Sequence, residues 1–285
     1  MRPSWPLWLA VLAMILGGCA SSGERRWVRE GFDAACRPEG AFTEAARLNT
    51  DSLDALEWSP FGAPERGWRV YTPRVAQEVA RRCAPDSGAF AAALARWQSA
   101  HGLGADGVFS PQSFAMMKDA WQARRPFLAL RAQGFCPPPP DEATLRPVGP
   151  DEAVEGKTVL LGSEALEAFG RLRAAAKREL GLDAQTLVVF SGYRSPAYDD
   201  ERCAREQNCQ GVVRAQCSAH RTGLALDLTL GAAPGYAIDA SDLPNRLFQS
   251  QTAAYRWLVA RAGRFGFVNY AFEPWHWEWT GPVPH

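Results

Sequence analysis

The sequence has no excess of charge of either sign. Its 31 Lys and Arg residues balance 31 Asp and Glu residues, so the formal net charge is zero. Proteins that bind nucleic acid through its phosphates usually carry a basic excess, so we expect no nucleic-acid partner. A chain of 285 residues with 47% hydrophobic and 22% charged residues is not disordered, and it is long enough for one or two domains with cores.

Long apolar runs are also scarce. The one at the N-terminus, from Trp5 to Leu16, is shorter than the roughly 20 residues that a membrane-spanning helix needs. Arg2 precedes this run and small residues follow it, which is the order of a secretory signal. Residues 1–18 are therefore predicted to be a signal peptide, removed before Cys19. An ordinary secretory signal with a chance cysteine would give the same export.

The run Leu16-Gly17-Gly18-Cys19 resembles the lipobox of bacterial lipoproteins, in which the cysteine is lipidated. The resemblance implies a lipid anchor at Cys19 and a protein that lies on a membrane, not across it. Residues 19–30 would form a polar tether. The expected location is the cell envelope, facing the periplasm, on the outer membrane in a Gram-negative cell.

Pairs of the form CxxC are absent, although six cysteines remain beside Cys19. They are Cys36, Cys83, Cys136, Cys203, Cys209 and Cys217. Export favours disulfides, so three bridges are expected. Three of these cysteines lie at or before Cys136 and three at or after Cys203, so complete pairing requires at least one bridge between the two halves. The sequence leaves the connectivity open, and a metal site on the last three is the weaker alternative.

The first half of the exported chain is predicted to be a helical domain over residues 31–135. Residues 72–125 have helical spacing of apolar residues, interrupted by a glycine-rich turn over 101–107. Ser110 is placed to cap a second helix that has Pro111 at its first position and ends near Pro126.

The segment from Trp97 to Ser113 resembles the repeat of the peptidoglycan-binding domain of bacterial wall hydrolases. Ser110 stands where that family usually has Gly, and residues 72–90 match it poorly. The resemblance implies wall binding, provided that the apolar lining of the groove is exposed. The alternative is that these residues only form a helical turn, and His101 is expected in the turn or groove rather than on a metal.

Cys136 and the prolines after it open a semi-rigid linker over residues 136–150, followed by a second domain over 151–285. That domain is predicted to be α+β with a mostly antiparallel sheet. Its first elements are a helix from Ser163 to Leu180 and a short buried strand from Leu187 to Phe190.

Two clusters in this domain combine histidine with carboxylates. In the segment 224–230 the leucines alternate with other residues, so a strand would bury the leucines and turn Asp227 to the opposite face. His220 lies seven residues before Asp227, close enough for a turn in the chain to bring its imidazole back over Asp227. In the segment 273–279 alternation places the three tryptophans in the core and His276 on the other face.

His220, Asp227 and His276 together offer three nitrogen or oxygen ligands. Three protein ligands leave a fourth tetrahedral position for water, which is typical of a catalytic zinc site. Pro274 cannot donate to a sheet, so Glu273 is free to turn toward this site and act as its general base.

Three motifs in order resemble the zinc D-alanyl-D-alanine carboxypeptidases of the VanY type. Residues 218–227 match SxHxxGxAxD, residues 273–276 match ExxH, and residues 191–195 match SGYRS. The resemblance implies zinc on His220, Asp227 and His276 and acid–base work by Glu273. It also implies that Arg194 stabilises the transition state or binds a substrate carboxylate, and Ser218 is a candidate to bind substrate.

We therefore expect a zinc metallopeptidase that acts on peptidoglycan stem peptides and releases terminal D-alanine. The family often has Gln shortly after SGYRS, which this chain lacks, and residues 203–217 look like an insertion. These departures leave the cleaved bond open. An endopeptidase of the same family and a catalytically silent, wall-binding lipoprotein are the alternatives.

Overall fold

The structure is a computed structural model that describes residues 40–80, 83–133, 136–183, 185–207, 209 and 217–282. The predicted signal peptide, Cys19, the tether and Cys36 lie outside the described residues. Within the described part of the chain, no helix is both long enough and apolar enough to cross a membrane.

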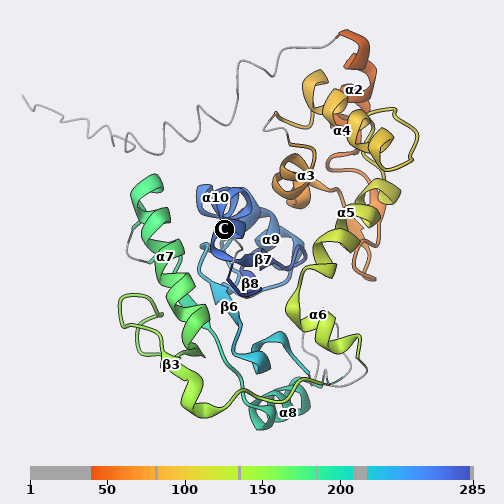
Figure 1. The fold of residues 1–285 in the computed structure, drawn as a ribbon. Helices are drawn as coiled ribbons and strands as arrows, with labels where there is room; N and C mark the ends of the chain where they lie inside the picture. The colour runs from red at the N-terminus through yellow and green to blue at the C-terminus, as the bar shows by residue number, and fades with distance from the viewer. Residues whose placement is uncertain are drawn as a thin grey trace, which may run out of the picture.

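The N-terminal half is mainly helical (Figure 1). Its elements are η1 (Gly40–Phe42), α2 (Thr43–Ser52), β1 (Glu57–Trp58), β2 (Glu65–Arg66), η2 (Arg69–Tyr71), α3 (Thr72–Glu78), α4 (Gly88–Ala100), α5 (Pro111–Ala123) and α6 (Pro126–Arg131). The helices expected between residues 72 and 125 are present. Ser110 caps α5 as predicted, because its Oγ accepts a hydrogen bond from the Ser113 N–H at 3.1 Å.

The prediction that the second helix ends near Pro126 is confirmed, because α5 ends at Ala123, but the further helix α6 that begins at Pro126 was not predicted. Proline disfavours helical backbone in the residue before it, and Arg125 is accordingly extended, with ψ of 122°. Pro126 itself is well suited to the first position of a helix. Arg125 therefore forms the corner at which the chain turns from α5 into α6.

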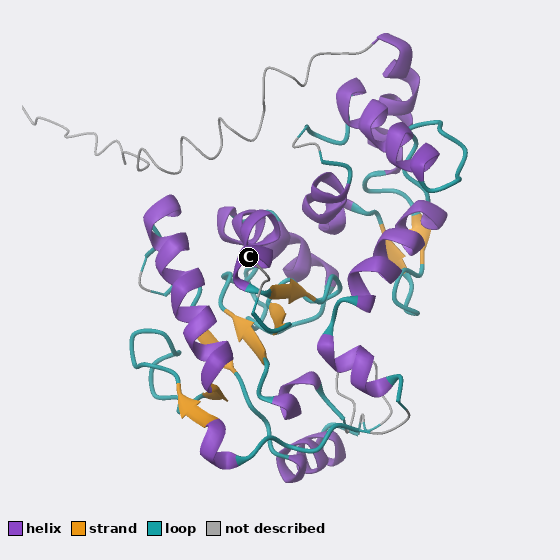
Figure 2. Cartoon of the chain, viewed as in Figure 1, coloured by secondary structure: helices purple, strands orange, loops and turns teal. Residues whose placement is uncertain are grey.

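The C-terminal half is α+β, as predicted. Its elements are η3 (Glu142–Thr144), β3 (Leu145–Pro147), β4 (Leu160–Gly162), α7 (Ser163–Leu180), β5 (Val189–Ser191), α8 (Pro196–Arg205), η4 (Ala219–Thr222), β6 (Ala225–Leu228), α9 (Leu243–Ser250), α10 (Ala253–Arg261), η5 (Ala262–Phe265), β7 (Phe267–Asn269) and β8 (His276–Trp279). The main sheet has the order β5-β6-β8-β7, and its paired strands are all antiparallel (Figure 2).

Two boundaries differ from those expected. The strand predicted over 187–190 is shifted to Val189–Ser191, since Leu187 has a left-handed φ of 56° that no regular strand allows. Residues 145–147, inside the predicted linker, form β3 and pair with β4. Sheet structure of the second half therefore begins before residue 150.

The sheet separates an apolar face from a polar one. Leu226 and Leu228 of β6 join Trp277 and Trp279 of β8 in a core with α7 and α10, which flank the sheet (Figure 1). Because side chains alternate along a strand, Asp227, His276 and Glu278 lie on the opposite face. Trp275 precedes β8 and is not part of this core, so the predicted placement of three tryptophans together holds for two of them.

The two halves pack against each other. The core of the N-terminal half includes Ala271 from the second half, and the Phe61 ring lies 5.7 Å from Tyr270 and 5.3 Å from Phe272, between ring centroids. Two apolar residues of the motif that resembles a wall-binding repeat, Trp97 and Phe109, are buried in this core beside Phe114, Met117 and Trp121 of α5. The exposed apolar lining that groove binding requires is thus not provided by these residues.

A disulfide also joins the halves. Cys136 is bonded to Cys217 across 81 residues, which confirms the predicted bridge between them. Cys203 is bonded to Cys209, and Cys83 is disulfide-bonded as well. The alternative of a metal site on the last three cysteines is therefore wrong.

Arg246 of α9 is the charged centre of the contact between the halves. Its guanidinium donates to the Glu65 carboxylate at 3.0 Å, to the Tyr71 hydroxyl at 2.6 Å and to the Phe272 carbonyl at 2.7 Å. The Arg246 and Glu65 side chains are only 1% and 5% exposed. Charges at this depth are stable only when paired, so the two halves depend on each other here.

We predict that Arg246→Met lowers the free energy of unfolding by about 3–5 kcal/mol, because it leaves Glu65 buried and unpaired. Urea unfolding measures the change. Arg47→Met, which removes surface ion pairs of an arginine that is 56% exposed, is the control and should leave the free energy of unfolding nearly unchanged. Equal stability of the two variants would contradict a structural role for Arg246.

Candidate active site

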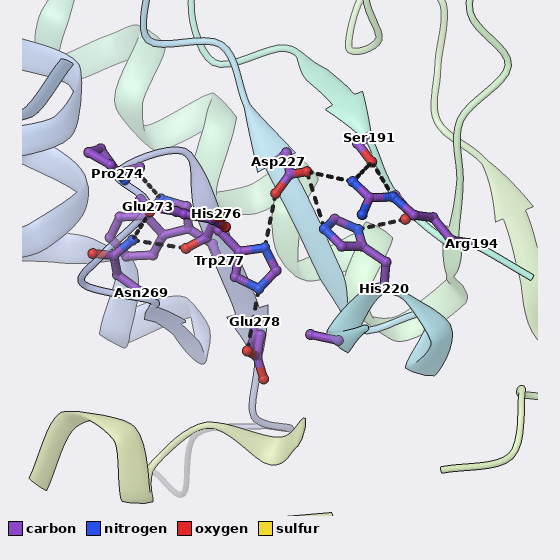
Figure 3. Close-up of polar contacts among 12 residues, drawn as sticks. Ser191, Arg194, His220, Asp227, Asn269, Glu273, Pro274, His276, Trp277 and Glu278 are labelled. Atoms are coloured by element: carbon purple, nitrogen blue, oxygen red, sulfur yellow. Dashed lines mark hydrogen bonds and ion pairs between the residues drawn. The ribbon is translucent and has the colours of Figure 1, made fainter. Parts of the chain in front are cut away.

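Two neighbouring strands and a short helical turn bring three ligand-type side chains together (Figure 3). Asp227 on β6 is the direct partner of His276 on β8 in the sheet register, and His220 comes from η4. The three side chains are buried, and one ligand atom from each lies within 4.8 Å of the others. The structure thus assembles the predicted metal ligands on the polar face of the sheet.

The backbone sets the orientation of the His220 ring. Its Nδ1 lies 2.7 Å from the Gly192 carbonyl oxygen, and a carbonyl can only accept a hydrogen bond. Nδ1 therefore carries the proton. The free nitrogen, Nε2, faces the cluster and lies 3.1 Å from Oδ2 of Asp227.

The His276 ring is oriented in the opposite sense, between two carboxylates (Figure 3). Its Nδ1 lies 2.9 Å from Oδ1 of Asp227, and its Nε2 lies 3.4 Å from Oε1 of Glu278. Glu278, which the sequence motifs do not include, thus faces the ring nitrogen that points away from the cluster. Nδ1 is the nitrogen of His276 that is placed to bind a metal.

This donor set fits a zinc ion. Two imidazole nitrogens and one carboxylate are common ligands of catalytic zinc, and the outer nitrogen of each ring faces an oxygen acceptor, as is usual for zinc-binding histidines. Burial, with the nearby charge of Arg194, lowers the pKa of His220 to about 4, which keeps the imidazole neutral. Burial alone would raise the pKa of Asp227, but the two histidines hold it well below its usual range.

Glu273 lies on the turn between β7 and β8 and lines the same pocket as the three ligands. Its side chain is buried, which raises its pKa from 4.5 to about 7 despite the opposing influence of His276. A carboxyl group with a pKa near neutrality can take up and return a proton during a reaction. The structure therefore places Glu273, the predicted general base, in the same pocket as the predicted metal ligands.

Asn269, at the end of β7, fixes this turn and was missed by sequence reasoning. Its Nδ2 donates to the carbonyl oxygens of Glu273 at 3.1 Å and His276 at 2.8 Å, and the Tyr255 hydroxyl donates to its Oδ1 at 3.1 Å. The side chain is fully buried. An asparagine within the apolar run 267–272 was the available signal, because a buried amide must bind something.

Arg194 reaches the cluster from the loop after β5. Its Nη2 donates to Ser191 Oγ at 2.7 Å and to Oδ2 of Asp227 at 3.1 Å. Ser218 lines the pocket too, but its hydroxyl donates to Asp199 at 2.7 Å. Arg194 therefore lies beside the predicted metal ligands, whereas the hydroxyl proton of Ser218 is engaged by Asp199.

The three predicted ligands line a pocket of about 270 Å³ together with Glu273, Arg194 and Ser218. One wall comes from the N-terminal half, through Arg125 and residues Phe127, Leu128 and Arg131 of α6. Trp275 of the C-terminal half also lines the pocket. A larger hollow of about 690 Å³, around residues 150–158, contains none of the predicted site residues.

Residues 158–282 match the family model of VanY, described as D-alanyl-D-alanine carboxypeptidase. The matched range contains every predicted site residue of the second half. No curated protein is similar enough to this chain to count as a match.

Two solved structures are each 21% identical to this chain and cover 50% of it. One is the LdcB LD-carboxypeptidase, studied for peptidoglycan recognition, with 70% of that chain covered and a TM-score of 0.37. The other is the D,D-pentapeptidase VanY of a VanB-type vancomycin resistance cassette, in complex with Zn(II), with 83% of that chain covered and a TM-score of 0.31.

The raised pKa of Glu273 predicts a stability effect in chelator-treated protein. The folded state binds the proton more tightly than the unfolded state, so the burial cost is absent below pH 4.5, grows between pH 4.5 and about 7, and is complete above that. Glu273→Gln has no charge to bury, so its free energy of unfolding should be about 3 kcal/mol higher than that of the wild type at about pH 8. Urea unfolding at about pH 5 and pH 8 measures this gain, with the exposed Glu164→Gln on α7 as the control; the same gain at both pH values would contradict it.

Proposed function

We propose that this protein, whose residues 158–282 match the VanY family model, hydrolyses a peptide bond in peptidoglycan stem peptides with the help of zinc. The observation that carries the proposal is the buried cluster of His220, Asp227 and His276, with Glu273 in the same pocket. Three protein ligands and a carboxyl base are the parts that a zinc peptidase requires.

The residues divide the chemical work. Zinc, when bound by the three ligands, polarises a carbonyl and makes water a stronger acid. Glu273 takes the proton from the attacking water and returns it to the leaving amine. Arg194, always charged and 16% exposed, faces the pocket and stabilises negative charge that develops on the substrate.

We further propose that the bond cleaved is the one before a terminal D-alanine. A terminal stem residue carries a free carboxylate, and guanidinium groups match carboxylates in charge and geometry. The pocket is lined by Arg131 of α6, Arg194 of the loop after β5 and Arg202 of α8. This concentration of arginine favours a carboxypeptidase over an endopeptidase.

The lipid anchor and the location in the cell envelope complete the proposal. Lipidation of Cys19 would keep the enzyme on a membrane that faces the peptidoglycan layer. Cell fractionation tests this, because Cys19→Ser should move the protein from the membrane fraction to the soluble fraction of the envelope.

Two substitutions should separate metal binding from proton transfer. His276→Ala is expected to lose zinc and activity together, because it removes a ligand. Glu273→Ala is expected to keep zinc and lose about 10²–10⁴-fold in kcat, because only the base is missing. Zinc content per chain and kcat are measured on both variants; full activity in Glu273→Ala would disprove its role as the base.

Mass spectrometry of defined pentapeptide muropeptides identifies the bond. With zinc-loaded protein we expect the loss of a single alanine, and no loss with Glu273→Ala. An internal cut would instead identify an endopeptidase. An unchanged substrate together with zinc content near zero would identify a wall-binding lipoprotein without activity.

A further inference from the structure

A buried ion pair links the N-terminal half to the candidate metal site. Arg125 Nε donates to Oε1 of Glu278 at 2.6 Å, and the two side chains are only 7% and 2% exposed. The Phe127 backbone N–H donates to the other carboxylate oxygen at 3.1 Å. Both donors are more than 150 residues away from Glu278 in the sequence.

The corner between α5 and α6 presents these two donors. Arg125 is extended because Pro126 follows it, and Phe127 lies in the first turn of α6, where backbone N–H groups have no partner within the helix. The Arg125 guanidinium is further held by Gln122 at 3.0 Å and stacks over the Tyr270 ring at 4.1 Å. Contacts within the protein thus hold the Arg125 guanidinium and the Phe127 N–H in place beside Glu278.

Glu278 in turn faces His276. The carboxylate oxygen that accepts from Arg125 is also the one that lies 3.4 Å from His276 Nε2, at the long end for a hydrogen bond. A carboxylate at this position orients the ring and raises the electron density on the opposite nitrogen. For His276 that nitrogen is Nδ1, which faces Asp227 and the cluster.

We propose that Arg125 is a positioning residue of the metal site, acting through Glu278 on His276. This inference rests on the proposed zinc function. The N-terminal helical half is then a component of the catalytic centre, since it supplies both groups that hold Glu278. A separate binding module would leave Glu278 without this counter-charge.

Zinc affinity tests the proposal. Arg125→Gln removes the charge and should weaken zinc binding about 10- to 100-fold, the usual cost of losing such an outer partner. Arg125→Lys keeps the charge and should recover part of the loss. The dissociation constant is measured on the full chain by competition with a chromophoric chelator, and the absorption of the Co(II)-substituted protein reports the ligand geometry.

Arg246→Met is the matched control, because it breaks the other buried contact between the halves without touching Glu278. It should lower the unfolding temperature and leave the zinc dissociation constant unchanged. Arg47→Gln, on the surface of α2, controls for the loss of an arginine as such. An Arg125→Gln variant that is less stable but binds zinc as the wild type does would overturn the proposal.

Glu278→Gln supplies a second route if Arg125→Gln does not fold. It keeps the shape of the side chain and should weaken zinc binding to a similar extent, and the double variant should lose little more than either single variant. Fully additive losses of zinc affinity would show that Arg125 does not act through Glu278, and a raised KM with unchanged zinc affinity would show that Arg125 acts on substrate instead. A wild-type chain that binds no zinc would refute the proposed function itself, and not this inference alone.

Discussion

The buried carboxylate of Asp227 is the constraint on which the site depends. A charged group at 3% exposure is stable only if opposite charges or hydrogen-bond donors surround it. Arg194 and His276 meet that requirement from two different segments, with nitrogens 3.1 Å and 2.9 Å from its oxygens, while the unprotonated Nε2 of His220 faces it at 3.1 Å. The same arrangement turns a nitrogen of each histidine toward the carboxylate. Asp227 and the two histidine nitrogens that face it together form the candidate metal site.

The need to pair buried charges extends outward from this centre. His276 lies between Asp227 and Glu278, and Glu278 is bound by Arg125. Each carboxylate is too deeply buried to be left without a partner, so the chain of contacts ends only where it reaches the N-terminal half. The packing of the two halves and the geometry of the site therefore depend on the same contacts. The Arg246 cluster and the Cys136–Cys217 bridge hold the same contact from other directions.

Sequence reasoning succeeded where chemistry is local. Alternation along two short segments placed Asp227 and His276 on one face, and their register in the sheet agrees with it. Caps and helix ends such as Ser110 and Gly181 follow from single residues. Arg125 and Glu278 could not be paired in this way. They are 153 residues apart in the sequence, and their contact depends on how the two halves pack together. Only parity of the cysteines hinted at that contact, since it required a bridge between the halves.

The same packing changes how the N-terminal half is understood. Its resemblance to a wall-binding repeat rests on residues such as Trp97 and Phe109, and these are 8% and 4% exposed, inside a core that Ala271 of the second half helps to close. What this half contributes to the candidate site is instead α6, with Leu128 and Arg131 in the wall of the pocket. A segment that both lines the pocket and holds Glu278 can influence substrate choice and metal binding together. Differences in α6 would therefore change specificity without any change in the three ligands or in Glu273.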